Sequence, residues 1–232
     1  MRSGDIFVGI LLGAPGSGKG TQGATLSELY RIPTISTGDL LRIEIASLSP
    51  LGWHVKSVIA GGQLVGDELV NDMVSNRISQ ADCARGFLLD GYPRSRPQAQ
   101  FLDSLLEERQ LPEPAVIHLD VPLEQLKTRM LARRQCPGCK RTLSVLAGGE
   151  FRAKIAKGLC PYDDSRLVTR PDDRVEAVES RLAGYENYER EVVAHYQARN
   201  YHRINGNTSM HEVTAQVLEA LTAVVVVAAQ LC

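Results

Sequence analysis

The sequence has no excess of charge of either sign, no hydrophobic run long enough to cross a bilayer, and no internal repeat or low-complexity segment. Its 26 lysines and arginines nearly balance 27 aspartates and glutamates, so nothing demands nucleic acid or a membrane as a partner, and any basic site must be local. The apolar run at 223–229 is far too short to span a membrane and is typical of the buried end of a last helix. The run at 6–12 ends in a glycine-rich loop and lacks the small-residue cleavage site of a signal peptide. We therefore expect a cytoplasmic location.

Cysteine is also scarce, and its placement does not indicate a disulfide framework. The five cysteines are Cys83, Cys136, Cys139, Cys160 and Cys232. Three of them cluster with a spacing that is typical of a metal site. At 232 residues the chain is long enough to bury a sizeable core as one domain with insertions.

The most informative stretch that is present lies at residues 13–21, GAPGSGKGT, which matches the phosphate-binding loop G-x-x-x-x-G-K. The apolar run at 6–12 predicts a buried strand before it, and helix-compatible sequence follows it. Glycines let backbone N–H groups turn toward a polyphosphate, the following helix adds positive charge at its N-terminus, and Lys19 would reach the outer phosphates. Gly20 stands where a serine or threonine usually follows the lysine, and Thr21 comes next. A chance glycine-rich turn is the alternative, and the strand–loop–helix context argues against it.

A second informative stretch follows the apolar run at 87–89, which predicts a buried parallel strand with Asp90 at its carboxyl end. In open α/β sheets, ligands gather beyond those strand ends. A carboxylate opposite a phosphate loop is well placed to hold magnesium, directly or through water. The alternative is an Asp-Gly pair that only forms a turn.

Arginines near predicted helix ends suggest anion binding. Ser36 or Thr37 can cap a helix that opens at 38–39, and Arg42 lies about one turn into that helix. A cation there opposes the helix dipole unless an anion is bound; a solvated surface arginine is the alternative.

On a later helix, predicted from about Leu123, Arg129 and Arg133 are four residues apart and share a face. These two like charges repel mildly unless an anion lies between them. A solvated basic helix end is the alternative.

The cysteine cluster has the pattern C-x2-C-x20-C-x2-D, formed by Cys136, Cys139, Cys160 and Asp163. Two C-P-x-[CD] knuckles are typical of a structural zinc site, and Asp164 is an alternative fourth ligand. The segment between the knuckles has no long apolar periodicity, so a metal would supply its folding energy. Reduced cysteines in turns are the alternative, and a catalytic zinc is disfavoured because no vacant coordination position is implied.

Periodicity predicts the remaining elements. We expect helical segments within 46–66 and from Asp67, the second with Leu69, Val70, Met73, Val74 and Ile78 in the core. A strand is predicted at 116–119, and a long helix from 169–173 with proline in its first turn and a buried stripe of Val175, Val178, Leu182 and Tyr185. A last strand is predicted at 201–204 and a last helix from Met210.

Taken together, these motifs resemble those of a long-type adenylate kinase with a zinc-bearing lid, and the resemblance covers nearly the whole chain. It rests on 13–21, 36–42, Leu64-Val65, 67–70, 87–94 with Gln98, Arg129 and Arg133, 170–173, and Arg181. It implies an α/β fold, a P-loop three-layer α/β/α arrangement with a parallel five-stranded sheet. It further implies a single nucleoside-monophosphate kinase domain at 1–232, with an NMP-binding arm at 36–65 and a zinc-bearing lid at 132–173.

The resemblance implies reversible transfer of a phosphoryl group, ATP + AMP = 2 ADP, with magnesium and a structural zinc. The catalytic residues it implies are Lys19, Arg94, Arg129, Arg133, Arg170, Arg181 and Asp90. The ATP site would comprise Gly16, Ser17, Gly18, Lys19, Gly20, Thr21, Arg133, Thr142, Leu143 and Thr208. The AMP site would comprise Thr37, Arg42, Gln63, Leu64, Val65, Gly91, Tyr92, Pro93, Arg94, Gln98, Arg170 and Arg181. Asp39 and Asp90 would hold magnesium through water.

Some positions depart from the family pattern. Gly66 replaces the commoner threonine, and Thr142-Leu143 stand where an aromatic residue often lies near the donor base. This leaves GTP:AMP transfer open as an alternative, together with other monophosphate acceptors, although Gln98 favours AMP. A nucleotide-binding module without turnover would be expected to lack part of this charge cluster. Lys19, Asp90 and all six arginines of the predicted sites are nevertheless present, namely Arg42, Arg94, Arg129, Arg133, Arg170 and Arg181. The expected partners are ATP and AMP, with no nucleic acid and no membrane, and the family default is a monomer.

Overall fold

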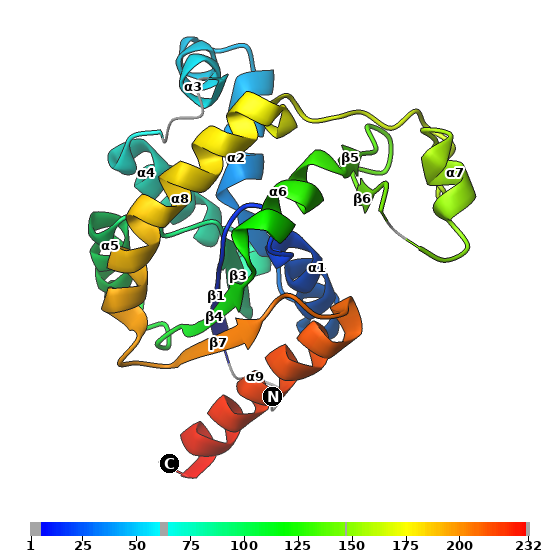
Figure 1. Ribbon diagram of the computed structural model, residues 1–232. Helices are drawn as coiled ribbons and strands as arrows, with labels where there is room; N and C mark the ends of the chain where they lie inside the picture. The colour runs from blue at the N-terminus through cyan, green and yellow to red at the C-terminus, as the bar shows by residue number, and fades with distance from the viewer. Residues whose placement is uncertain (1–5, 61–64, 147, 231–232) are drawn as a thin grey trace.

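The computed structural model describes residues 6–60, 65–146 and 148–230. Its centre is a five-stranded parallel sheet in the order β2-β3-β1-β4-β7. The strands are β1 (Phe7–Leu12), β2 (Thr34–Ser36), β3 (Gly86–Asp90), β4 (Ala115–Asp120) and β7 (Tyr201–Asn205). Each is preceded or followed by helices, which cover both faces of the sheet (Figure 1). The predicted three-layer α/β/α arrangement is confirmed.

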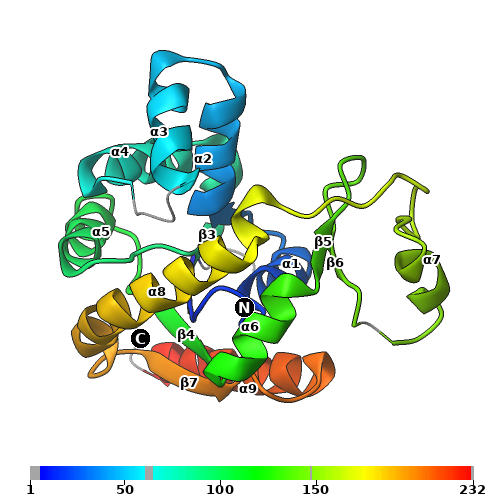
Figure 2. The same cartoon turned by 45° about the horizontal axis from the view of Figure 1, so that its top comes forward.

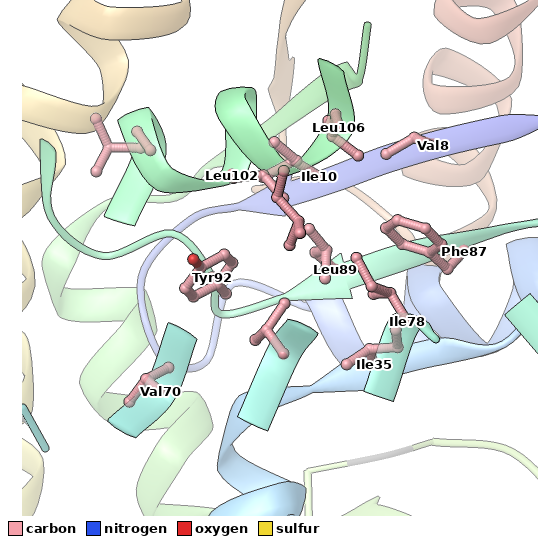
Figure 3. Close-up of a cluster of buried hydrophobic side chains, with 14 of the residues drawn as sticks. Val8, Ile10, Ile35, Val70, Ile78, Phe87, Leu89, Tyr92, Leu102 and Leu106 are labelled. Atoms are coloured by element: carbon pink, nitrogen blue, oxygen red, sulfur yellow. The ribbon is translucent and has the colours of Figure 1, made fainter. Parts of the chain in front are cut away.

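Alternating strand residues face opposite layers, as a period of two requires. On one face, residues such as Ile10 and Leu89 pack against α4 (Asp67–Ile78), α5 (Arg96–Glu108) and the end of α8 (Figure 3). Burying each such side chain contributes about 1.5–3 kcal/mol. The predicted core stripe of α4 is confirmed, with Val70, Val74 and Ile78 buried and Leu69 and Met73 packed against the same cluster.

On the other face, the alternate strand residues pack against α1 (Lys19–Tyr30) and α9 (Met210–Gln230). A third cluster joins α6 (Leu123–Leu131) to α8 (Val175–Tyr196) beside the loop after β1. The run at 223–229 lies within α9, but its side chains lie outside what the structure describes. Among the described residues, no helix combines the length and apolar character needed to cross a membrane.

Two segments project from this layered core in different directions (Figure 2). One consists of α2 (Thr37–Ala46) and α3 (Pro50–Ala60). The other begins at the antiparallel pair β5 (Arg133–Gln135) and β6 (Thr142–Ser144) and includes α7 (Arg152–Ala156). Short 3-10 turns lie at Ala81–Cys83 and Pro171–Asp173.

The predicted start of the long helix at 169–173 is wrong. Pro171–Asp173 form a separate 3-10 turn, Arg174 is extended, and α8 begins at Val175. Val175 is 48% exposed, whereas the other three predicted stripe residues, Val178, Leu182 and Tyr185, are buried. The physical reason is that Asp173 turns inward to pair with arginines, and these ion pairs hold the turn apart from the helix.

Candidate active site

The loop between β1 and α1 is built from glycines in conformations that other residues rarely adopt. Gly13, Gly16 and Gly18 have φ values of 139°, 88° and 104°. Gly18 is the N-cap of α1 and offers no side-chain cap, so the first N–H groups of the helix remain available to an anion. Ser17 Oγ is buried without a hydrogen-bond partner among the described residues. An unpaired buried hydroxyl inside such a loop fits a phosphate oxygen.

Lys19 is the first residue of α1, and its ammonium group turns back into the loop. It donates to the carbonyl oxygens of Gly13 and Ala14 at 2.6 and 3.0 Å. Withdrawal from water lowers its pKa to about 8, and Asp90 opposes this effect. The guanidinium groups of Arg94, Arg181 and Arg133 add to the lowering. The excess of positive charge around Lys19 would stabilise a bound polyanion.

Asp90 ends β3, directly opposite Leu11 of β1 in the sheet register. A Cβ built on Gly20 would lie 3.8 Å from Asp90 Oδ2, so the carboxylate faces the start of α1. Among the described residues, no hydrogen bond or ion pair occupies this carboxylate. The carboxylate is therefore available to a hydrated cation beside the loop.

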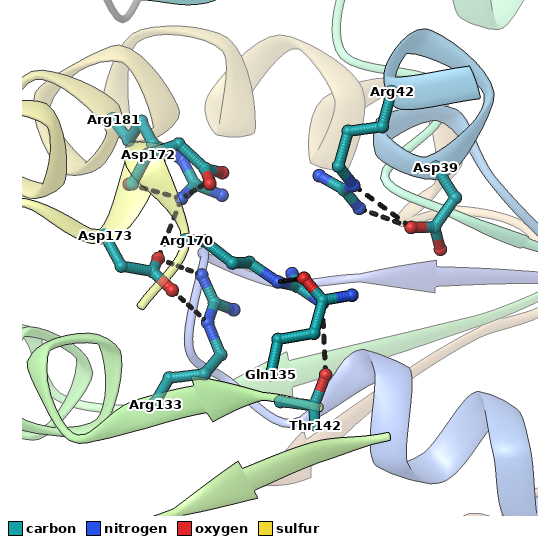
Figure 4. A network of polar contacts seen from close by, with 9 residues as sticks. All are labelled: Asp39, Arg42, Arg133, Gln135, Thr142, Arg170, Asp172, Asp173 and Arg181. Atoms are coloured by element: carbon teal, nitrogen blue, oxygen red, sulfur yellow. Dashed lines mark hydrogen bonds and ion pairs between the residues drawn. The ribbon is translucent and has the colours of Figure 1, made fainter. Parts of the chain in front are cut away.

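Figure 4 shows four of the predicted arginines in one region of the molecule, each held by a neighbouring side chain. Arg133 Nε donates to Asp173 Oδ2 at 2.7 Å, and Arg181 Nη1 lies 2.9 Å from Asp172 Oδ2. Arg170 donates to Gln135 Oε1 at 3.1 Å and to Thr142 Oγ1 at 3.0 Å. Arg42 is paired with Asp39 at 2.5 Å.

The electrostatics show that these groups share one space. Burial lowers the pKa of Arg170, and the nearby Arg133 and Arg42 guanidinium groups lower it further. Burial opposes the shift of Asp172, yet Arg181, Arg42, Arg133 and Arg170 together hold its pKa below the usual value. Such crowding of cations stabilises a bound polyanion.

Arg129 does not join this cluster. Its Nη1 donates to the Gly206 carbonyl at 3.1 Å, in the turn after β7. Thr208 lies in the same turn, where its hydroxyl contacts the Asn205 carbonyl at 3.4 Å. The structure thus places Arg129 against the turn after β7 that also contains Thr208, a residue predicted for the ATP site.

Some of the residues predicted for AMP lie around the carboxyl ends of β2 and β3 and the start of α5, whereas the predicted Arg42 lies on α2, Arg170 beside the 3-10 turn at Pro171–Asp173 and Arg181 on α8. Thr37 Oγ1 and Arg94 Nε both donate to the Gly91 carbonyl, at 2.9 and 2.7 Å. Gln98 is 3% exposed, and Val65 is buried. The predicted residues Gln63 and Leu64 lie outside the described residues. Tyr92 and Pro93, which are joined by a cis peptide bond, complete the loop to Arg94.

Sequence reasoning missed two of the groups that organise this site, Asp172 and Asp173. It used them as signals for a helix start and as part of the 170–173 motif but gave them no role in the site, although they hold Arg133 and Arg181. One signal could have identified them: two adjacent acids follow Arg170-Pro171 directly, and the predicted sites contain several arginines for which the sequence indicates no acidic partner. Tyr188 on α8 was also missed; burial raises its pKa, and Arg94 and Arg181 oppose the rise.

The predicted zinc ligands come together at the base of the second projecting segment. The ligand atoms of Cys136, Cys139, Cys160 and Asp163 lie within 4.8 Å of one another. Cys139 Sγ is 3.6 Å from Cys160 Sγ, and Cys136 Sγ is 3.2 Å from Asp163 Oδ2. Tetrahedral ligands around zinc would be separated by about 3.8 Å or slightly less, so the donor set fits the ion. Asp164 instead pairs with Lys154 at 2.8 Å.

The comparisons with known proteins agree with this geometry. A family model described as adenylate kinase matches residues 11–201. An adenylate kinase of Lachnospira eligens is 37% identical over 213 residues, which cover 91% of this chain and 98% of that protein. Those of Thermodesulfovibrio yellowstonii and Oceanobacillus iheyensis are 38% and 40% identical over 205 residues, 88% of this chain and 94% of each relative. A glycine-rich loop, an arginine cluster and a cluster of cysteines with an aspartate thus occur together with similarity over nearly the full length, and the chain belongs to the adenylate kinase family.

Proposed function

We propose that this protein is an adenylate kinase that transfers the γ-phosphoryl group of ATP reversibly to AMP, giving two ADP. The observation that carries the proposal is the position of Lys19. Its ammonium group lies within the electrostatic reach of Asp90, Arg94, Arg133 and Arg181, between the phosphate loop and the residues around Gly91. Phosphoryl transfer needs alignment of two nucleotides and positive charge around the moving group.

The phosphate loop and α1 would bind the donor. Gly16 to Thr21 would wrap the β- and γ-phosphates, chiefly through the backbone N–H groups at the start of α1, and Ser17 Oγ, which has no hydrogen-bond partner among the described residues, would add a hydroxyl. The Lys19 ammonium, now on two loop carbonyls, would move onto the transferring group. Arg129 and Thr208 would contact the donor base, with Thr142 and Leu143 on the lid side.

The arginines would neutralise charge as the phosphoryl group moves. Asp172 and Asp173 hold Arg133 and Arg181 in place, which reduces the reorganisation that binding requires. Arg170 would act with them. On the acceptor side, Thr37, Arg42 and Arg94 would hold the AMP phosphate, and Gln98, the backbone around Val65 and the Gly91–Pro93 loop would hold the rest of AMP.

Magnesium fits Asp90 better than Asp39. The Asp90 carboxylate faces the phosphate loop without a partner among the described residues, whereas Asp39 is tied to Arg42 at 2.5 Å. When bound with ATP, the ion would shield the phosphate oxygens and orient them for transfer. We therefore assign Asp90 as the principal carboxylate for magnesium-bound water, and Asp39 as a second one only after Arg42 has left it.

We further infer a single nucleoside-monophosphate kinase domain in which 36–65 and 132–173 close over the substrates, with a structural zinc in the second. Closure would exclude water, which would otherwise accept the phosphoryl group. Monomeric state and cytoplasmic location remain predictions from sequence. Sedimentation of the purified protein and fractionation of its native cells test these two predictions.

A coupled assay tests the activity. The protein is offered ATP or GTP as donor, with AMP, CMP, UMP and GMP as acceptors, in the presence of magnesium. We expect the highest kcat/KM for the ATP–AMP pair. A preference for GTP or for another acceptor would replace the proposal with the corresponding kinase. Tight ATP binding without transfer to any acceptor would mean a binding module.

A further inference from the structure

A ring of side chains joins the first turns of α4 and α5 beside the proposed acceptor site. Ser95, the N-cap of α5, donates to Asp67 Oδ2 at 2.7 Å and accepts from the Gln98 backbone N–H at 3.2 Å. Gln98 Nε2 donates to the other carboxylate oxygen, Asp67 Oδ1, at 2.7 Å. Both oxygens of Asp67 are therefore engaged, and the ring closes on the amide of Gln98.

A separate contact fixes the opposite end of that amide. The Arg94 backbone N–H donates to Gln98 Oε1 at 2.7 Å. A carboxylate can only accept and a backbone N–H can only donate, so the two contacts assign one orientation to the amide. If the amide turned over, Oε1 would face the Asp67 carboxylate and Nε2 would face an N–H donor. Gln98 is 3% exposed, so little water is available to compensate for that arrangement.

The fixed amide presents an edge of defined polarity. After these contacts, Oε1 retains a lone pair and Nε2 retains one N–H. An acceptor beside a donor matches a base that carries an exocyclic amine next to an unprotonated ring nitrogen, as adenine does. A base held in the same position but carrying a carbonyl oxygen next to a ring N–H, as hypoxanthine does, is disfavoured. Its carbonyl oxygen would face Oε1, two acceptors together, and its ring N–H would face the Nε2 N–H, two donors together.

The two helices are also held together behind the ring. The Tyr92 hydroxyl donates to Asn71 Oδ1 on α4 at 2.6 Å and lies 3.3 Å from the Gln98 carbonyl oxygen on α5. Tyr92 is fully buried. The position of Asp67 relative to Gln98 is therefore set by packing as well as by the ring itself.

We propose that Asp67 is a positioning residue that sets the base selectivity of the acceptor site, by locking the Gln98 amide in the orientation that complements adenine. This inference rests on the proposed function, because it places the acceptor base against Gln98. It adds a residue that does not itself contact the base.

The test compares kcat/KM for AMP and for IMP, the monophosphate of hypoxanthine, with ATP as donor. We expect Asp67→Ala to lower the AMP-to-IMP ratio by roughly 10-fold or more, as the loss of a charged hydrogen bond implies. Asp67→Asn keeps an acceptor oxygen at the same place and should lie nearer the wild type. Asp72→Ala removes an exposed carboxylate from the same helix and should leave the ratio unchanged.

Other results would overturn the inference. If folded Asp67→Ala loses the same factor with both acceptors, or if Asp72→Ala shifts the ratio equally, Asp67 has only a structural role. If Asp67→Ala does not fold, Ser95→Ala removes the contact that holds Oδ2, and an unchanged ratio in that variant would count against the lock. A wild-type protein that does not phosphorylate AMP would instead contradict the proposed function itself.

Discussion

Lys19 carries a charge that its surroundings disfavour. Its pKa in the folded protein is about 8, against 10.5 for an ordinary lysine, mainly because the ammonium group is withdrawn from water. Between these two values the unfolded chain binds more protons than the folded chain, so stability rises with pH there. Below pH 8 the charged form costs folding free energy, which a bound polyphosphate would offset.

We therefore expect Lys19→Met to separate activity from stability. The variant should lose roughly 10²–10³-fold or more in kcat, as the removal of one preorganised donor implies. Its Tm at pH 7 should equal or exceed that of the wild type, and this advantage should shrink between pH 8 and 10. Thermal melts at pH 7 and at pH 10 test this expectation, with Lys56→Met, which changes an exposed lysine, as the control. A large loss of stability at pH 7 would show that the two loop carbonyl contacts outweigh the buried charge.

The prediction that Arg133 shares a helix face with Arg129 is wrong, because α6 ends at Leu131 and Arg133 begins β5. Side chains such as Lys19 and Asp90 could be predicted from sequence because each lies in a motif or at the end of a strongly apolar run. The partners of the charged side chains could not be predicted. Asp173 reaches Arg133 across 40 positions of the chain, and no local pattern specifies which of 27 acidic residues will do so. The pairing of Arg42 with Asp39 was likewise not predicted, because an arginine one turn into a helix was interpreted either as binding an anion or as a solvated side chain.

The segment between β5 and α8 has almost no apolar core. Among its described residues from 137 to 172, the buried apolar side chains are limited to Ile155 and the metal-site thiol Cys160. The predicted lack of a separate core is thus confirmed, and it follows from the absence of apolar periodicity. A bound zinc would supply the missing folding energy, on the order of 10 kcal/mol.

Adjacent acids provide a matched test of that metal site. Asp163→Asn removes one of the four clustered donors, whereas Asp164→Asn removes only an exposed pairing with Lys154. We expect the first variant to lose most of its zinc by elemental analysis and to melt several degrees lower. The second should keep about one zinc per chain and the wild-type Tm. Equal zinc contents in the two variants, or no metal in protein purified without chelator, would contradict the assignment.

Across the whole molecule, the layered sheet was predictable because buried parallel strands such as 7–12 and 87–89 are continuous apolar runs. A buried polar contact that links β4 to the last strand and to α8 was not predictable. His118 on β4 is 3% exposed; its Nδ1 lies 2.5 Å from the Tyr201 hydroxyl on β7, and its Nε2 lies 3.0 Å from Glu189 Oε1 on α8. A lone polar residue in an apolar strand carries no sequence signal for partners 71 and 83 positions away.

The contact between His118 and Glu189 predicts how the stability of the protein depends on pH. The hydrogen bond from His118 lowers the pKa of Glu189 despite the opposing effect of burial. A carboxyl group with a lowered pKa stabilises the fold above its unfolded-state pKa and loses that contribution as pH falls through the folded-state value. We therefore expect Glu189→Gln to destabilise the protein at pH 7 by about 1–2 kcal/mol, or roughly 3–6 °C in Tm, and by much less in acid.

The matched control is Glu186→Gln, one turn earlier on α8, where the side chain is exposed. Glu186 and Glu189 both line a cavity of about 110 Å³ beside His118. Loss of this second charge should leave Tm nearly unchanged at either pH, because the Glu186 carboxylate is exposed, forms no ion pair among the described side chains, and therefore contributes little. If both variants lower Tm equally, net charge on α8 rather than the His118 contact governs the effect. If Glu189→Gln lowers Tm as much in acid as at pH 7, the glutamate acts through packing, since a protonated carboxyl group and an amide then have the same charge.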